Sequence, residues 1–126
     1  MIQETNKPIK VLIADDEVEF ASTLMTRLQL RNFSVESVNS GKETLEAIAK
    51  EVPDVVLLDL KMPDLDGLEV LARIRQDHPE LTVFILTGHG SFEAGKEGMN
   101  LGANDYIMKP VDLNRLIKKM EDSLGV

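Results

Sequence analysis

The sequence of 126 residues contains no cysteine and no tryptophan, and aromatic residues make up only 4% of it. Without cysteine the chain forms no disulfide, no thiolate metal site and no thiol nucleophile, which suits a reducing cytoplasm. With so few aromatic rings, aliphatic side chains must fill the core. No stretch has the character of a signal peptide or a membrane span, so we expect a cytoplasmic protein without membrane contact.

Positive charge is also scarce. The chain has 14 Lys and Arg residues against 22 Asp and Glu residues, a formal net charge of −8, which disfavours direct binding to nucleic acid. The length allows one domain with one core. We expect this domain over residues 9–126, after a short N-terminal lead-in over residues 1–8.

Short apolar runs alternate with segments of helical period, and this alternation indicates the fold class. Three nearly continuous apolar runs predict strands buried on both faces: Ile9–Ala14, Val55–Leu58 and Val83–Leu86. Two more mixed runs, Ser34–Val38 and Tyr106–Met108, predict strands nearer a sheet edge. The segments between them predict five helices, and the pattern as a whole indicates a doubly wound α/β domain with a five-stranded parallel sheet.

Capping signals mark the starts of several helices. Ser40 with Glu43, and Asp66 with Glu69, have the spacing of capping boxes, and Asp112 is positioned to cap the last helix. Asp64, Asp66 and Gly67 are assigned to turns and caps, and Lys118 and Lys119 to an exposed helix face.

Polar residues follow the ends of four predicted strands, where an open α/β sheet binds its ligands. They are Asp15, Asp16, Glu17, Asp59, Thr87 and Lys109. Each alone is an ordinary turn, cap or surface residue. Together, at four strand ends, they indicate a site.

Carboxylates brought together at one sheet edge repel one another unless a cation neutralises them, which predicts a divalent ion, Mg²⁺ by its preference for carboxylates and phosphate oxygens. Asp59, on the central strand, is the candidate nucleophile toward phosphorus. Lys109 and the Thr87 hydroxyl are suitable groups for stabilising phosphoryl oxygens.

Four motifs in this order resemble the receiver domains of two-component response regulators, over about residues 10–124. They are VLIADDE (Val11–Glu17), VVLLDLKMPDLDG (Val55–Gly67), ILTGHG (Ile85–Gly90) and GANDYIMKP (Gly102–Pro110). The resemblance implies a flavodoxin-like sheet of strand order 2-1-3-4-5, an order for which the chemotaxis member of this family is a standard example.

The resemblance also implies roles for single residues. Asp59 is the expected phosphoacceptor, and Asp15, Asp16 and the backbone carbonyl of Lys61 are expected to complete the Mg²⁺ site with it, Asp16 as a direct carboxylate ligand. Thr87 and Lys109 are expected to contact the phosphoryl group. Tyr106 resembles the aromatic switch residue of the family, and the peptide bond after Lys109 is typically cis.

The function that the resemblance implies is a phosphorylation-activated switch rather than a metabolic enzyme. A sensor histidine kinase or a phosphotransfer protein would supply the phosphoryl group from phosphohistidine, and an effector protein or an output domain would receive the signal. The sequence is compatible with a stand-alone regulator and with the receiver of a longer protein. The side chains of Lys61 and His89 are expected to tune the lifetime of the phosphoaspartate.

Three alternatives compete with this interpretation. A phosphatase of the haloacid dehalogenase type needs a second acid two residues after the nucleophile, where this chain has Lys61, and a larger chain. A pseudo-receiver lacks parts of the site, whereas this sequence has them all. A nucleotide-binding domain is the weakest alternative, because no GxGxxG or GxxxxGK[ST] follows a predicted strand.

The fourth predicted helix, over residues 92–101, contains Gly95 and Gly98, each of which costs a helix about 1 kcal/mol relative to alanine. We therefore predict that this helix is the least stable before phosphorylation. Amide hydrogen exchange of the unphosphorylated protein should be faster across residues 92–101 than in the other helices, and slow exchange there would contradict the prediction.

Overall fold

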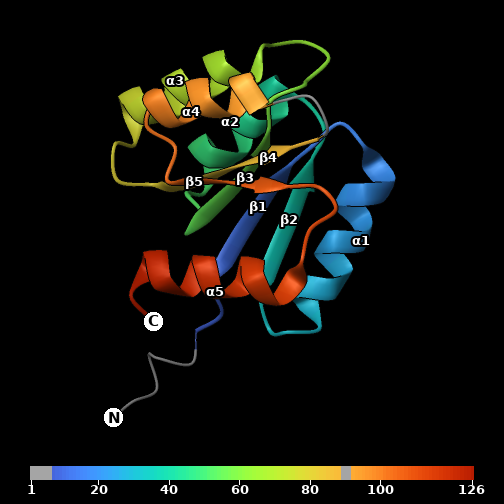
Figure 1. Cartoon of the computed structure of the whole chain (residues 1–126). Coiled ribbons are helices and arrows are strands. Elements are labelled where there is room, and N and C mark those ends of the chain that lie inside the picture. The colour runs from blue at the N-terminus through green and yellow to red at the C-terminus, as the bar shows by residue number, and fades with distance from the viewer. Residues whose placement is uncertain (1–6, 89–91) are drawn as a thin grey trace.

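The computed structural model describes residues 7–88 and 92–126, and strands and helices alternate along the chain (Figure 1). The strands are β1 (Lys10–Ala14), β2 (Ser34–Val38), β3 (Val55–Asp59), β4 (Thr82–Thr87) and β5 (Asp105–Met108). The helices are α1 (Val18–Gln29), α2 (Gly41–Lys50), α3 (Gly67–Asp77), α4 (Phe92–Asn100) and α5 (Leu113–Leu124).

All five strands pair in parallel, in the order β2-β1-β3-β4-β5. This confirms the predicted doubly wound α/β fold and its strand order. Strand β3 lies at the centre, and all five of its residues are buried, as its continuous apolar sequence requires when helices cover both faces of a parallel sheet. The outermost strand β2 has no fully buried residue, which agrees with its more polar composition.

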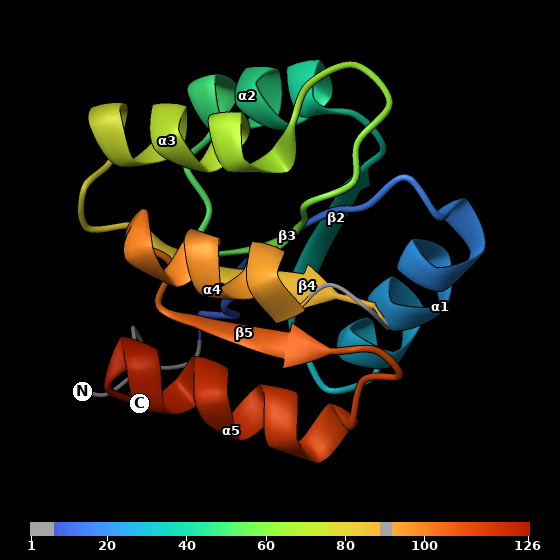
Figure 2. The same ribbon diagram turned by 45° about the horizontal axis from the view of Figure 1, so that its top comes forward.

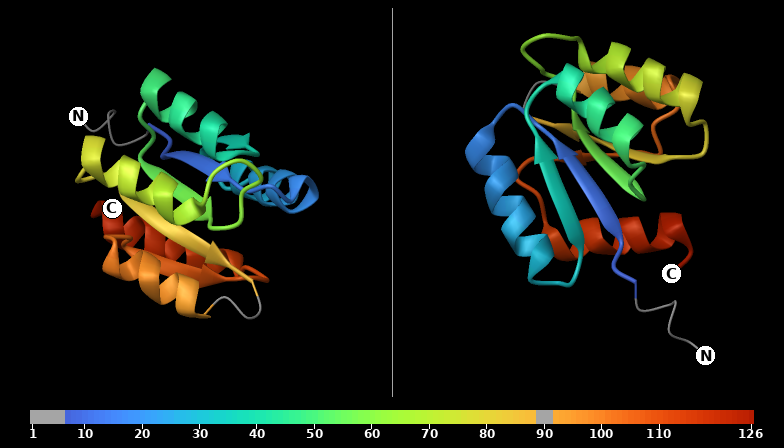
Figure 3. Two further views of the ribbon diagram at one scale, coloured as in Figure 1. Left: turned by 90° about the horizontal axis from the view of Figure 1, so that it is seen from above. Right: turned by 180° about the vertical axis from the view of Figure 1, so that it is seen from behind.

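Two hydrophobic clusters lie on opposite faces of the sheet, because successive side chains of a strand point to opposite sides. Val55 and Leu57 of β3 face the cluster that α1 and α5 cover. Val56 and Leu58 face the cluster on the side of α2, α3 and α4, and Figures 2 and 3 show the two helical layers. Within the described ranges, every helix is too short or too polar to cross a lipid bilayer.

The predicted strand bounds differ from the observed ones at several ends. Ile9 precedes β1 rather than beginning it, although its carbonyl accepts a hydrogen bond from the Ser34 N–H at 2.9 Å. Strand β3 continues one residue further, through Asp59, and β4 extends from Thr82 to Thr87. The polar residues Asp59 and Thr82 belong to these strands because the pairing of β3 with β4 continues beyond the apolar residues.

Side-chain caps begin three helices as the sequence predicts. Ser40 Oγ accepts the Glu43 N–H at 3.1 Å, and Asp112 accepts the Arg115 N–H at 3.2 Å. Asp66 caps α3 by accepting the Leu68 N–H at 3.0 Å.

The capping box expected from Asp66 and Glu69 was wrong in its second half. The Glu69 carboxylate instead accepts a hydrogen bond from Arg73, one turn later, at 2.7 Å. An i, i+4 ion pair on the exposed helix surface competes with the capping contact.

The expectation of an exposed face at Lys118 and Lys119 is correct for Lys118 alone. Lys119 is half-buried, and its ammonium pairs with Asp105 of β5 at 2.5 Å.

Gly98 allows α4 to lie close to β4. A Cβ atom at this position would be only 2.0 Å from Cδ1 of Ile85, a fully buried residue. A Cβ atom at Gly95 would be 3.4 Å from Thr87 Cγ2, an ordinary contact distance. The two glycines look equivalent in the sequence, but only Gly98 is at a position where the packing of α4 on β4 leaves no room for a side chain.

This difference predicts opposite effects for two alanine substitutions. Gly95→Ala should raise the free energy of unfolding by about 0.5–1 kcal/mol, because alanine favours the helix and fits the available space. Gly98→Ala should lower it by up to about 2 kcal/mol, because overpacking against Ile85 outweighs the gain in helix propensity. Urea unfolding of both variants and the wild type measures the sign, and stabilisation by Gly98→Ala would contradict the packing argument.

Candidate phosphoacceptor and metal site

The strand register brings the predicted site residues to one edge of the sheet. Ala14 pairs with Leu58, so the residues that follow or end these strands, Asp15 and Asp59, lie side by side. Asp59 in turn pairs with Leu86, which places Thr87 one position further along β4.

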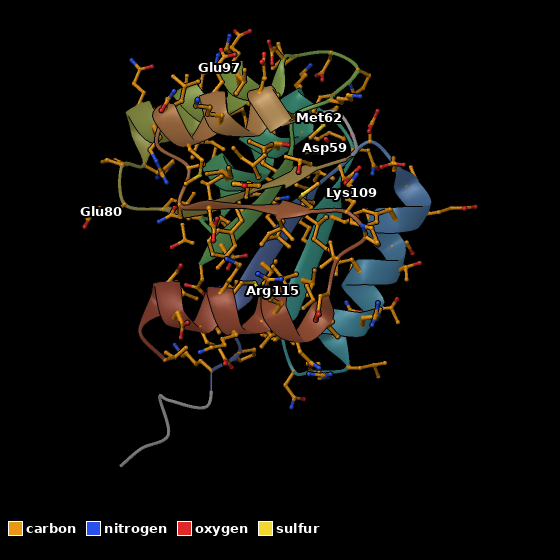
Figure 4. The ribbon with its side chains drawn as sticks, viewed as in Figure 1. Asp59, Met62, Glu80, Glu97, Lys109 and Arg115 are labelled. Atoms are coloured by element: carbon orange, nitrogen blue, oxygen red, sulfur yellow. The ribbon has the colours of Figure 1, made fainter. Side chains whose placement is uncertain are left out.

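The last strand completes this edge. Thr87 pairs with Met108, so Lys109 follows immediately, and its N–H donates to the Thr87 carbonyl at 2.7 Å. Figure 4 shows Asp59 and Lys109 at this edge, with Glu80 far from them, in the loop before β4. The peptide bond between Lys109 and Pro110 is cis, as expected.

Lys109 is the cation of the site. Its Nζ atom lies 2.5 Å from Glu17 Oε1, 2.9 Å from Asp15 Oδ2 and 3.6 Å from Asp59 Oδ2. The ammonium also lies 4.4 Å from the centre of the Phe20 ring, a cation–π distance. Burial lowers the pKa of Lys109, but its contacts with Glu17 and Asp15 outweigh this and raise the pKa above its usual value. Lys109 therefore stays charged.

Three carboxylates face this lysine. One oxygen each of Asp15, Glu17 and Asp59 lies within 4.8 Å of the other two, a spacing that can hold a metal ion. Asp15 is fully buried: its Oδ1 accepts the Glu17 N–H at 2.9 Å, and its Oδ2 pairs with the Lys109 ammonium at 2.9 Å. One ammonium facing three carboxylates leaves an excess of negative charge in a partly buried site. This excess of carboxylate oxygens fits a divalent cation bound beside Asp59.

Asp59 is 7% exposed, and its Oδ1 accepts the Lys61 N–H at 3.0 Å. Burial raises the pKa of Asp59 to about 6, and the Asp15 carboxylate adds to the rise, while the Lys61 N–H and the Lys109 ammonium oppose it. Near neutral pH the side chain is therefore ionised but destabilised. Binding of a cation, or loss of its negative charge, would stabilise a carboxylate in this state.

The structure separates the acidic residues that follow β1. Asp16 is exposed, and the three-carboxylate cluster of the described residues contains Glu17 in its place. The sequence assigns no specific role to Glu17, although its place in the acidic run Asp15–Glu17 is a signal that could have identified it. The expected role of Asp16 as a direct metal ligand stays a prediction.

The other predicted site residues lie around Asp59. Thr87 is buried and Lys61 is exposed, in the loop after β3. Tyr106 is 38% exposed, and its ring lies on the α4 side of β5, 3.9 Å from where a Cβ atom of Gly95 would be. His89 and Gly90 lie outside the described residues. The roles expected for Lys61, Thr87 and Tyr106 stay predictions.

Asp64, assigned from the sequence to a turn, makes a contact that sequence spacing does not reveal. Its two carboxylate oxygens accept the N–H groups of Gly41 and Lys42, the first two residues of α2, at 2.8 and 2.9 Å. These hydrogen bonds lower the pKa of Asp64. The side chain thus caps a helix that begins more than twenty residues earlier.

A family model for the response regulator receiver domain matches residues 11–121. The chain is 37% identical over 113 residues to the response regulator MprA of Mycolicibacterium vanbaalenii, which covers 90% of this chain and 49% of that protein. It is 33% identical over 121 residues to the transcriptional regulatory protein ZraR of Escherichia coli K12, covering 96% of this chain and 27% of that one. The chain thus spans about half or less of the length of these relatives.

Solved structures agree with the sequence comparison. A putative response regulator from Chloroflexus aurantiacus superposes with a TM-score of 0.89 and 33% identity, covering 95% of this chain and all of the other. The receiver domain of NtrX from Brucella abortus gives a TM-score of 0.87 and 33% identity, covering 92% and 98%.

A five-stranded flavodoxin-like sheet with carboxylates and a lysine at its carboxyl edge defines a class of signalling domain. The chain belongs to the family of response regulator receiver domains, the receiving modules of two-component systems.

The raised pKa of Asp59 predicts how stability depends on pH. The folded-state pKa of about 6 exceeds the ordinary value of 3.8, so the contribution of Asp59 to the stability of the wild type falls as pH rises from about 4 to about 6. Asp59→Asn, which is neutral throughout, should therefore be more stable than the wild type at pH 7 by about 1–2 kcal/mol without divalent ions, after allowance for solvent screening. The advantage should vanish near pH 4.

Asp64→Asn is the matched control for this prediction, since the same substitution removes a carboxylate whose pKa is lowered. It should destabilise the protein at pH 7. Thermal unfolding of both variants at several pH values tests the sign, and an Asp59→Asn variant less stable than the wild type at pH 7 would overturn the argument.

Proposed function

We propose that this domain is a phosphorylation-activated signalling switch in which Asp59 accepts the phosphoryl group. The observation that carries the proposal is that Asp59 and the buried Asp15 lie in one carboxylate cluster and share the Lys109 ammonium, at 3.6 and 2.9 Å. This combination supplies a nucleophile, a place for a cation and a fixed positive charge, the groups that phosphoryl transfer requires.

The donor in this proposal is the phosphohistidine of a sensor histidine kinase or of a phosphotransfer protein. A carboxylate oxygen of Asp59 attacks phosphorus, and the bond between phosphorus and the imidazole nitrogen breaks. The electron pair returns to the imidazole, which takes up a proton, and Asp59 carries an acyl phosphate. Asp59 Oδ2 is the oxygen nearer Lys109, at 3.6 Å, so the ammonium is placed to pair with the transferred group.

Asp15 and Asp59 would hold Mg²⁺, with Asp16 and the Lys61 carbonyl as the further ligands that we propose. Bound there, the ion would neutralise the carboxylates and the incoming phosphoryl oxygens. Lys109 would then be released from Asp15, because the same oxygen that it faces at 2.9 Å is the one available to a metal.

An open groove between α1 and the segment after β5 gives a partner access to this edge. Phe20, Arg27, Lys109 and Pro110 are among its lining residues. The donor protein's histidine side chain must reach Asp59, and a groove lined in part by Lys109, which faces Asp59, suits that approach.

The outgoing signal in this proposal depends on Thr87 and Tyr106. Phosphorylation would draw the Thr87 hydroxyl toward the phosphoryl group and shift an existing equilibrium toward the active form. Tyr106, exposed on β5, has its ring 3.9 Å from a Cβ position on Gly95, beside Thr87, and would move toward the place that Thr87 leaves. An effector protein, or an output domain of a longer protein, would recognise the active form.

Incubation with acetyl phosphate and Mg²⁺, followed by intact-mass measurement, tests the proposed function. The wild type should gain one phosphoryl group, and a chelator should prevent the gain. Asp59→Asn should gain none, because an amide is not a nucleophile toward phosphorus.

Asp77→Asn is a matched control, because Asp77 ends α3 and lines a pocket with Asp54 and Glu80 away from the site. It should be labelled like the wild type. An unlabelled wild type, or an Asp59→Asn variant labelled to the same extent, would refute the proposal.

A further inference from the structure

The loop between β3 and α3 carries Lys61, and three contacts hold this loop in place. The Lys61 N–H donates to Asp59 Oδ1 at 3.0 Å, and the Gly67 N–H donates to the Leu60 carbonyl at 3.1 Å. The third contact is the Asp64 carboxylate, which joins the loop to α2. The first two join the loop to β3 and α3, the elements that flank it in the chain. Among these three, the Asp64 contact is the one that ties the loop to an element outside this segment.

The free N–H groups in the first turn of α2 are capped by two segments of the chain, the residues just before the helix and the loop that carries Asp64. Ser40, the helix's own cap, accepts the Glu43 N–H, and the Glu43 carboxylate accepts the Asn39 N–H at 2.9 Å. The N–H groups of Gly41 and Lys42 are left to Asp64. Helix α2 thus offers the loop an anchor with two hydrogen bonds, to which the positive end of the helix dipole adds an attraction.

Packing supports the same anchor. A Cβ atom on Gly41 would lie 2.8 Å from Leu65 Cβ and 3.0 Å from Val70 Cγ2. The loop therefore approaches α2 as closely as a glycine permits. Asp64 and Leu65 hold this approach by a polar and an apolar contact, respectively.

We infer that Asp64 is a positioning residue for the metal site: by anchoring the loop on α2, it fixes the backbone at Lys61 beside Asp59. The inference rests on the proposed function, in which the Lys61 carbonyl is a metal ligand. Ligating groups lose affinity when their supporting contacts are removed, typically by about 10- to 100-fold. Both carboxylate oxygens of Asp64 accept N–H groups of α2, and the carboxylate cluster of the described residues does not include Asp64, so in this scheme it acts through Lys61.

Magnesium binding by the unphosphorylated protein, measured by isothermal titration calorimetry, tests this inference. Asp64→Ala should weaken Mg²⁺ binding about tenfold. Asp64→Asn, which keeps one oxygen that can accept an N–H, should fall between Asp64→Ala and the wild type. In the metal-free protein, the Lys61 amide should exchange its hydrogen faster in Asp64→Ala than in the wild type.

Ser40→Ala is the matched control, because it removes a cap from the same helix terminus without touching the loop. Its Mg²⁺ affinity should stay within about twofold of the wild type. With acetyl phosphate, Asp64→Ala should need more Mg²⁺ for half-maximal labelling but reach the wild-type rate at saturation.

Wild-type Mg²⁺ affinity in Asp64→Ala, or an equal loss in Ser40→Ala, would overturn the inference, since the effect would then be absent or a general consequence of a weaker helix. A wild type that binds Mg²⁺ but gains no phosphoryl group would refute the proposed function, while the comparison of Asp64 and Ser40 variants would still decide the role of Asp64. A wild type that binds no Mg²⁺ would overturn both.

Discussion

The charge imbalance at the carboxyl edge of the sheet is the constraint on which the rest of this site depends. Three carboxylates, Asp15, Glu17 and Asp59, converge within 4.8 Å, and one ammonium, Lys109, faces them. Burial raises the free energy of the ionised form of Asp59 and the neighbouring Asp15 carboxylate adds to it, and the raised pKa of Asp59 records that cost. The protein holds the cluster in a state that a divalent cation and a phosphoryl group would both change, which is the property that a switch requires.

The backbone supplies the rigidity that this arrangement needs. The register of β1, β3, β4 and β5 sets Asp15, Asp59, Thr87 and Lys109 beside one another, and two hydrophobic clusters fix the sheet between its helical layers. The loop after β3 is not part of the sheet, so it needs contacts of its own. The hydrogen bonds from α2 to Asp64 are such contacts, and they extend the support of the site to a helix that contributes no residue to the carboxylate cluster.

The sequence predicts most of the fold because the relevant signals are local. Apolar runs located the strands, and Ser40, Asp66 and Asp112 cap the helices as predicted. The missed features depend on residues distant in the chain or on side-chain reach. Glu17 pairs with Lys109, which lies 92 residues later in the chain. Asp64 caps α2, a helix that precedes it, and Gly98 is needed because the Ile85 side chain occupies the space beside it. No local sequence pattern indicates these contacts, because they form only when the chain has packed into its tertiary structure.

The central claim is that Asp59, and no other carboxylate of the cluster, receives the phosphoryl group. Borohydride reduces an acyl phosphate to an alcohol, so an aspartate that carried the group becomes homoserine, which peptide mass spectrometry locates. After treatment with acetyl phosphate and Mg²⁺, the account predicts homoserine at position 59 alone. Homoserine at position 15 or 16, or a phosphorylated protein in which position 59 stays aspartate, would contradict it.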